Sequence, residues 1–235
     1  MKESSIQMYD RLLSLPLFLG MSQWDLHEVA AHTPLAFSTY ETGHTIVSAD
    51  DVSDSLLLLI HGDVMSHMES YDREWSLDEC LHSPYMHQPE HLFGWHQRYT
   101  RSLQALTPSQ VLTITKGDVL TLLSQLQTIR FNLLNNLCIR AQRMSVLSWR
   151  ALPIGITAKL LRWMDDACDS PVGSKTFHIR MTYLAQVLGE SRLNLSRCLH
   201  DLEDQGLLVM HRGEIEIPSM EQMRGYIRGG DSATT

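Results

Sequence analysis

The clearest pattern of apolar positions lies in residues 181–208, where two short helical periods are separated by Gly189. Glycine takes positive φ without steric cost and therefore ends a helix readily. Thr182 is the expected N-cap of the first helix, and Ser191 that of the second. The apolar positions of the two helices are Leu184, Ala185, Leu188, Leu195, Cys198, Leu199 and Leu202. A short helix, a glycine turn and a longer helix are typical of a helix-turn-helix.

The second helix has an outer face that suits DNA. If Leu195 is the centre of the buried face, the helical repeat turns Leu193, Arg197 and His200 outward. Arginine donates twice to a guanine edge, and asparagine or serine serves bases or phosphates. The alternative is an αα-hairpin that only packs, with these residues on a solvated face. The expected DNA contacts on the two helices are Thr182, Ser191, Arg192, Leu193, Asn194, Ser196, Arg197 and His200.

The segments around these helices indicate a winged helix-turn-helix over residues 151–228. After Gly206, residues 207–211 and 214–217 flank Arg212-Gly213, which is a hairpin signal. A helix over residues 156–168 and a short strand over residues 177–180 precede the pattern. Arg212 at the tip of the wing is placed to meet a phosphate. The tail, residues 229–235, is expected to be disordered.

Residues 1–117 have a different pattern of apolar and polar positions. Helical patterns over residues 5–32, with Ser22 as a helix start, are followed by short apolar runs broken by Gly, Asp, Ser and Pro. Short strands at regular spacing are typical of a β-sandwich or barrel. The expected strands are residues 35–40, 44–47, 55–60, 64–69, 75–79, 102–106 and 111–114.

Residues 118–150 carry an apolar stripe at a spacing near 3.5 residues. A helix of this length is about 48 Å long, which is more than a small domain needs for its own core. The stripe is covered either by the two flanking domains or by a second copy, and paired helices suit its length better. The expected dimerisation residues are Leu122, Leu126, Ile129, Leu133, Leu137 and Met144.

Charge and composition bear on two questions, whether the chain can bind DNA and whether it is a membrane or secreted protein. The net charge of −8 comes mostly from residues 1–149, with 9 Lys/Arg and 16 Asp/Glu, whereas residues 150–235 have 10 and 11. Phosphate attraction is local and screened beyond about 10 Å, so the net charge does not exclude DNA. The chain has no membrane-length apolar run and no secretory signal, so we expect a cytoplasmic protein.

Cysteine and histidine spacing indicates neither a disulfide framework nor a metal site. The four cysteines, at 80, 138, 168 and 198, include no CxxC pair. The twelve histidines are scattered and form no HExxH or finger pattern. We therefore expect no metal, no cofactor and no catalytic residues.

The order of barrel, long helix and winged helix-turn-helix is similar to that of the Crp/Fnr family, the regulators related to the cyclic-AMP receptor protein. Residues 191–199 and 202–207 resemble the family's recognition-helix sequence, SRxTVSRxLxxLExxGLI. Residues 92–94 and 101–102 resemble pieces of its cyclic-nucleotide phosphate cassette, which reads FGE followed by RS. The likeness extends from about residue 12 to residue 217.

The resemblance implies an α+β fold: an N-terminal double-stranded β-helix or jelly-roll barrel, a long dimerisation helix and a C-terminal winged helix-turn-helix. It also implies a homodimer on near-palindromic double-stranded DNA, with recognition helices in major grooves about 34 Å apart. RNA polymerase is a further implied partner. Arg192 and Arg197 correspond to base- and phosphate-contacting arginines, whereas Leu193 stands where many members carry a glutamate that reads cytosine.

The barrel departs from the family's cassette. Trp95 stands in place of the glutamate that accepts hydrogen bonds from the ribose, and the segment to Arg101 is too short for the phosphate-capping helix. We therefore expect an effector other than cyclic AMP, or none. The first cysteine, Cys80, lies too far along the chain for an FNR-type iron–sulfur site. The candidate effector pocket comprises Phe93, Gly94, Trp95, Arg101 and Ser102.

Two other functions remain open from the sequence. One is a cupin-like metal enzyme with an appended helical domain, which would need His and carboxylate ligands converging inside the barrel. The other is a sensor module that acts only through protein partners, with a helix-turn-helix that no longer binds DNA.

Overall fold

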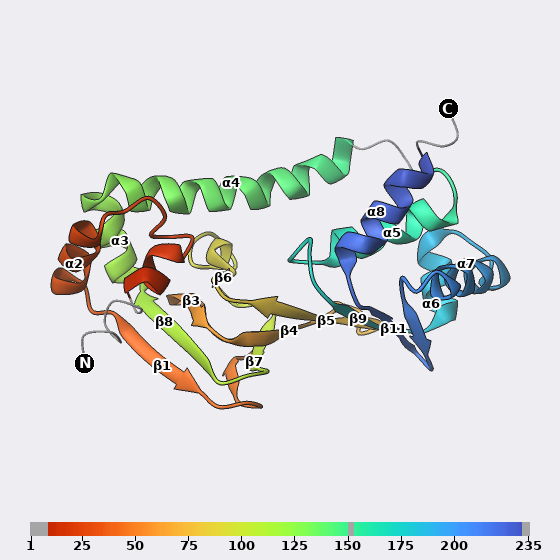
Figure 1. The fold of residues 1–235 in the computed structure, drawn as a ribbon, viewed down its shortest axis with the longest axis horizontal. Coiled ribbons are helices and arrows are strands. Elements are labelled where there is room, and N and C mark those ends of the chain that lie inside the picture. The colour runs from red at the N-terminus through yellow and green to blue at the C-terminus, as the bar shows by residue number, and fades with distance from the viewer. Residues whose placement is uncertain (1–8, 150–152, 232–235) are drawn as a thin grey trace. The chain divides into compact units, whose positions relative to one another are not determined.

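The computed structural model describes residues 9–149 and 153–231, and the side chains of residues 9–145 and 153–226. The chain divides into two compact units (Figure 1). Unit 1 comprises Met1–Met65 and Leu81–Val146, and unit 2 comprises Ser66–Cys80 and Leu147–Thr235. The expected domain boundary at residues 150 and 151 lies outside the described residues.

Unit 1 contains the expected barrel. The antiparallel strands β1 (Ala36–Tyr40), β8 (Ser109–Thr115), β3 (Ser55–His61) and β6 (Tyr85–His87) form one sheet in that order. In the other sheet, β2 (Thr45–Val47) pairs with β7 (Ser102–Ala105), which neighbours β4 (Asp63–Glu69). All the expected strands are present, and β6 is an additional one that the sequence pattern did not indicate.

Two apolar clusters fill unit 1. The first lies between the barrel strands and contains Val47, Leu59, Val64, Leu81, Tyr99, Leu103 and Val111. The second joins the outer face of the first sheet to the helices of the unit. Residues 9–14 are helical, and α2 (Gln23–His32) begins at Ser22, which forms a capping box with Asp25.

The expected single helix over residues 118–150 is wrong. The structure has α3 (Lys116–Gln125) and α4 (Gln127–Trp149), separated at Leu126, whose backbone is extended. Arg130 accounts for the break, since its Nε donates to the carbonyl of Leu123 and its terminal nitrogen donates to that of Ser124. These bonds satisfy carbonyls that the end of α3 leaves without intrahelical donors.

The apolar stripe on α3 and α4 faces the core of unit 1, which contradicts its expected role in dimerisation. Leu122, Ile129 and Leu133 are buried there, and Leu126 and Leu137 are partly buried against the same cluster. Met144 is 74% exposed and is not part of this cluster. The barrel therefore covers the stripe, because its own outer sheet face needs an apolar partner.

Unit 2 contains α5 (Ile156–Ala167), β9 (Lys175–Ile179), α6 (Met181–Leu188), α7 (Arg192–Asp204), β10 (Val209–His211), β11 (Glu214–Ile217) and α8 (Met220–Asp231). Helix α8 was not expected, and it continues into the segment predicted to be disordered. Its first turns are fixed because Met220 and Met223 are buried in the core. Residues 232–235 lie outside the described residues.

The remaining part of unit 2 is the segment Ser66–Cys80, which we call the flap. Strand β5 (Trp75–His82) pairs antiparallel with β9, from Trp75 opposite Ile179 to Glu79 opposite Lys175. The flap thus supplies a fourth strand to the sheet β10-β11-β9-β5, and Leu77 enters the core of unit 2. This corrects the assignment of residues 66–80 to a separate N-terminal domain.

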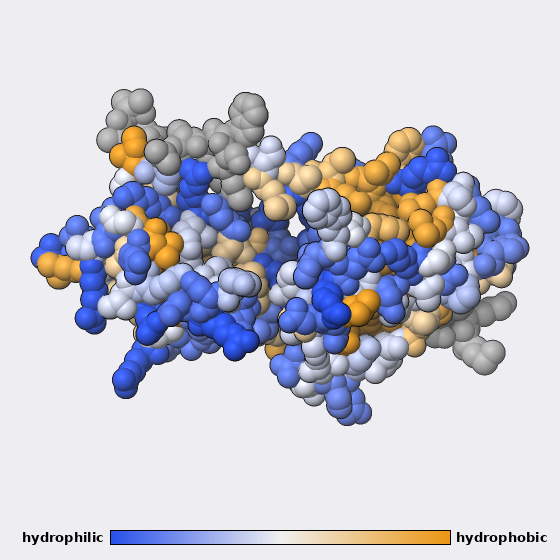
Figure 2. Space-filling view, turned by 180° about the vertical axis from the view of Figure 1, so that it is seen from behind, coloured by the Kyte–Doolittle hydropathy of each residue, from blue (hydrophilic) through white to orange (hydrophobic). Residues whose placement is uncertain are grey.

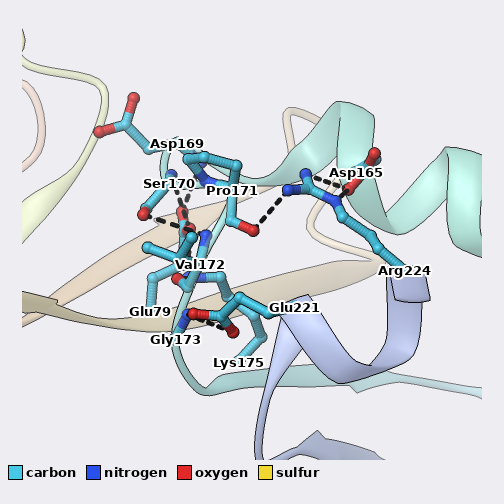
Figure 3. Close-up of polar contacts among 10 residues, drawn as sticks. All are labelled: Glu79, Asp165, Asp169, Ser170, Pro171, Val172, Gly173, Lys175, Glu221 and Arg224. Atoms are coloured by element: carbon cyan, nitrogen blue, oxygen red, sulfur yellow. Dashed lines mark hydrogen bonds and ion pairs between the residues drawn. The ribbon is translucent and has the colours of Figure 1, made fainter. Parts of the chain in front are cut away.

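The loop between α5 and β9 is held from two sides (Figure 3). From the flap, the buried carboxylate of Glu79 accepts hydrogen bonds from the amides of Asp169 and Ser170. From α8, Glu221 accepts from the amide of Gly173, and Arg224 pairs with Asp165 of α5. The loop is therefore fixed in place just before the strand that leads into α6.

Candidate nucleic-acid interface

The helix-turn-helix has the expected turn geometry. Gly189 ends α6 with φ +64°, and the amide of Glu190 donates to the carbonyl of Ala185 at 2.9 Å. Ser191 then caps α7, its hydroxyl accepting from the amide of Asn194 at 3.1 Å. Gly206 closes α7 with φ +70°. The left-handed glycines satisfy the last carbonyls of each helix and set the direction of the next segment.

Thr182 does not cap α6. The N-cap is Arg180, which makes no side-chain capping bond, and Thr182 lies exposed in the first turn. The reason is that β9 ends at Ile179, so the chain enters the helix two residues earlier than the sequence pattern indicated.

Helix α7 presents the predicted outer face. Leu195, Cys198, Leu199 and Leu202 are buried. Leu193 is 60% exposed, and Arg192, Asn194, Arg197 and His200 are exposed as well, while Ser196 is half-buried. An αα-hairpin that only packs could show the same division between buried and exposed residues. Exposure alone therefore does not distinguish it from a DNA-binding surface.

Two hollows flank α7. Between α7 and the wing lies one of 220 Å³, lined in part by Arg192, Ser196 and His211. On the other side lies one of 560 Å³, lined by Asn194 and Arg197 together with residues of α5 and Tyr226 of α8. Arg192 and Arg197 therefore border opposite sides of the same helix.

The wing is built as a tight hairpin on β9. Gly213 has φ +80°, and its carbonyl accepts from the amide of Ile179 at 2.9 Å. The carboxylate of Glu203 in α7 accepts from the amide of Met210 at 2.8 Å, which ties the wing to the recognition helix. Arg212 is exposed at the turn. The wing and α7 thus form one rigid surface.

The arginines of unit 2 differ in their partners. Among the described residues, Arg192, Arg197 and Arg212 have no carboxylate within ion-pair distance. By contrast, Arg180 pairs with Glu74 of the flap, and Arg224 with Asp165. The three unpaired guanidinium groups lie on α7 and the wing, where a DNA-reading surface requires positive charge.

Residues 156–226 match the family model described as the Crp-like helix-turn-helix domain. The chain is similar to the catabolite activator protein of Thermus thermophilus, with a TM-score of 0.50 and 21% identity, over 91% of this chain and 99% of that one. It is also similar to the sensor domain of the regulator DNR of Pseudomonas aeruginosa, with a TM-score of 0.50 and 19% identity, over 66% of this chain and 100% of that one. No curated protein matches in sequence.

Residues 156–226 are a Crp-like helix-turn-helix domain. At these identities the structural likeness shows only the fold of the rest of the chain. The helix-turn-helix domain and the α+β fold are accordingly those that the sequence predicted.

The candidate effector residues differ in how deeply they are buried. Arg101 is 7% exposed and therefore lies largely buried. Ser102 accepts a hydrogen bond from the amide of Ala49. Phe93 lies under the ammonium of Lys116, 5.0 Å from the ring centroid, and Gly94 is exposed with φ +92°. Trp95 is fully exposed and therefore does not line an enclosed pocket.

The backbone beside Arg101 is held by a residue that the sequence did not single out. The carboxamide of Gln88 accepts from the amides of Thr100 and Arg101, and donates to the hydroxyl of Thr100 at 2.6 Å. Residues 92–101, all within the described part of the chain, contain no helix. The segment that resembles the nucleotide cassette is therefore a loop fixed by Gln88.

Aromatic rings occupy the barrel interior near this loop. His87 and Tyr99 stack with centroids 5.3 Å apart, and the hydroxyl of Tyr99 donates to the carbonyl of Ser55. Burial raises the pKa of Tyr99 above its ordinary value. No group of three His, Cys, Asp or Glu side chains suited to a metal occurs among the described residues. No helix in the described part is long and apolar enough to cross a membrane.

Proposed function

We propose that the chain binds double-stranded DNA as a homodimer on a near-palindromic operator and regulates transcription there, in the cytoplasm and together with RNA polymerase. The observation that carries this proposal is the set of three unpaired arginines, Arg192, Arg197 and Arg212, on the exposed side of α7 and the wing. Paired arginines would have to give up a carboxylate before they bound phosphate, whereas these three are already available.

The proposal assigns base contacts to the N-terminal half of α7. Arg192 and Asn194 lie in the first turn of the helix, the part that reaches base edges in helix-turn-helix complexes. Arg197 and His200 lie farther along α7 and Arg212 lies on the wing, and these three suit phosphates. Ser191 is engaged as the N-cap, so its role is to shape the helix start.

A binding assay on the DNA upstream of the protein's own gene tests this proposal. Arg192→Ala and Arg197→Ala are each expected to weaken specific binding by about 1–3 kcal/mol. Arg11→Ala is the control, because Arg11 is an exposed arginine that belongs to unit 1 and not to the winged helix-turn-helix. Equal binding by all four proteins would show that α7 is not the recognition surface.

The dimer is proposed through α4, on a face other than the one expected from the sequence. Phe131, Leu134, Cys138, Ala141 and Ser145 are all exposed and alternate at intervals of three and four residues. That spacing forms the seam between two paired helices. Figure 2 shows hydrophobic side chains gathered on this side of unit 1. The opposite face of α4 is already covered by the unit's own core.

A further inference from the structure

The flap carries acidic side chains at the start of the first helix of the helix-turn-helix. Strand pairing sets this position, because Trp75 lies opposite Ile179 and the next residues along are Glu74 and Arg180. The carboxylate of Glu74 pairs with the guanidinium of Arg180. One helical turn later, the hydroxyl of Tyr183 donates to the carboxylate of Asp72 at 2.5 Å.

The flap tip is organised to hold these carboxylates in place. The amide of Ser70 donates to the carbonyl of Trp75 at 2.9 Å and closes the turn, in which Arg73 has φ +57°. Asp72 also accepts from the hydroxyl of Ser70 and from the amide of Glu74. Asp72 is therefore fixed from its own turn before it meets Tyr183.

Arg180 and Tyr183 lie where DNA backbone would pass. In helix-turn-helix complexes the first helix crosses the sugar-phosphate backbone while the second enters the groove. Arg180 is the N-cap of that first helix, and Tyr183 lies in its first turn. A guanidinium and a phenol at this position donate to phosphate oxygens, and a carboxylate presents the same acceptor chemistry.

We propose, on the basis of the proposed function, that Arg180 and Tyr183 bind the phosphates of the DNA backbone. In the absence of DNA, the flap carboxylates Glu74 and Asp72 bind these two side chains in place of phosphate. When DNA binds, a phosphate replaces the carboxylate of Glu74 as the anion that pairs with Arg180. The exchange needs only a side-chain rotation, since the side chain of Arg180 is 69% exposed and the backbone pairing of β5 with β9 does not involve it.

This arrangement makes the flap an inhibitor of DNA binding. The exposed ion pair must be broken before Arg180 reaches a phosphate, and each such pair is worth a two- to fivefold factor, roughly, in an equilibrium constant. Flap carboxylates that stay near the helix also repel the incoming backbone. Any event that withdraws the flap tip by a few ångströms would release the contact.

Four full-length proteins separate this specific exchange from a general effect of charge. They are the unaltered protein, Glu74→Gln, Arg180→Gln combined with Glu74→Gln, and the control Glu69→Gln. Glu69 is also a flap carboxylate, but its partner is Arg73 within the flap. Glu69→Gln therefore removes the same charge without releasing Arg180. The probe is a random-sequence DNA duplex, titrated at several salt concentrations, with thermal unfolding as a check that each variant is folded.

Glu74→Gln is expected to bind about two- to fivefold more tightly than the unaltered protein. Its logarithmic salt dependence should stay the same, because Arg180 reaches the same phosphate in both proteins once DNA is bound. Glu69→Gln should show a smaller gain, and the double variant should lose the gain of Glu74→Gln and have a slope shallower by about 0.9, the value for one phosphate. Equal effects of Glu74→Gln and Glu69→Gln, or weaker binding by Glu74→Gln, would overturn the inference. If the unaltered protein does not bind DNA at all, the proposed function itself fails.

Discussion

Glu79 of β5 and Lys175 of β9 form an ion pair, with 3.2 Å between Oε1 and Nζ, in which neither side chain is exposed to solvent (Figure 3). The carboxylate also accepts from the amides of Asp169 and Ser170, and the ammonium donates to the carbonyl of Val172 at 2.7 Å. A charge pair out of water is stable only when its remaining donors and acceptors are satisfied in this way. The pair therefore fastens the flap to the sheet of unit 2.

Glu79→Ala is expected to destabilise unit 2 by about 3–5 kcal/mol, because it leaves the buried ammonium of Lys175 without its carboxylate. Urea unfolding, followed by the fluorescence of Trp75 and Trp163, measures this loss, since both rings pack against the core of unit 2. Glu216→Ala, on the neighbouring strand β11, is the control and should change stability by about 0.5 kcal/mol or less. Similar losses for the two variants would contradict a structural role of the ion pair.

Leu193 is expected to set which operator is read. A leucine accepts no hydrogen bond from the amino group of cytosine, whereas a glutamate at the same exposed position does. Leu193→Glu should therefore shift the preferred operator towards cytosine at one position per half-site, by about 1–3 kcal/mol. Selection of bound sequences from a randomised DNA pool detects the shift. Leu193→Ala is the matched control, and a shift of the same kind with alanine would rule out the acceptor as its cause.

Leu134→Glu is expected to dissociate the homodimer, because it places a charge in the proposed seam of α4. Ile139→Glu adds the same charge at an exposed position of α4 that is three or four residues from no seam residue, and it should leave the dimer intact. Analytical ultracentrifugation distinguishes the two. Mild oxidation gives a second readout, since Cys138 lies on the seam and would crosslink to its own copy. A monomer for the unaltered protein would exclude this interface.

The contact between Asp72 and Tyr183 is expected to depend on pH at both ends of the scale. The phenol of Tyr183 lowers the pKa of Asp72, and the carboxylate of Asp72 raises the pKa of Tyr183. The contribution of Asp72 is present above a pH of about 4 and is lost as the pH falls through its lowered pKa. That of Tyr183 is present below a pH of about 10 and is lost as the pH rises through its raised pKa.

Ultraviolet titration of the tyrosines checks this dependence. In the unaltered protein, the pKa of Tyr183 should lie above the ordinary value of a tyrosine side chain. Asp72→Asn should bring the pKa of Tyr183 back towards its ordinary value, whereas Glu69→Gln should leave it raised. If Asp72→Asn had no effect, the hydrogen bond would not be the cause of the shift.

The helix-turn-helix could be predicted in detail because its signals are local. Gly189, Ser191 and Gly206 act on residues within five positions of themselves, and the buried face of α7 follows from spacing alone. The same was true of the other barrel strands, although β6 was missed and the pairing of the strands was unknown. Turn residues and the spacing of apolar positions were therefore enough to predict the helix-turn-helix and most of the barrel strands.

The break at Leu126 and the position of the flap could not be predicted in the same way. The apolar spacing continues through Leu126, and the break depends on how Arg130 satisfies the end of α3. Glu79 and Lys175 are about a hundred residues apart, and each reads as an ordinary polar position in a strand. A pairing of this kind leaves no periodic signal in either segment.

Trp95 shows a different limit. The sequence identified it as a substitution within the nucleotide cassette and placed it in the candidate effector pocket. The structure shows an exposed ring, which does not line an enclosed pocket. Sequence comparison identifies a substituted position, but it does not show whether the side chain at that position faces the interior of the barrel or the solvent.

The chain enters unit 2 twice, first at residues 66–80 and again after residue 146. A chimera in which the DNA-binding domain of one regulator replaces that of another is usually designed with a single junction between the two sequences. For this protein such a chimera would leave the fourth strand of the sheet behind, with the ammonium of Lys175 facing a foreign neighbour. A working graft has to carry two separate stretches of sequence, and the shorter of them lies inside the sensor.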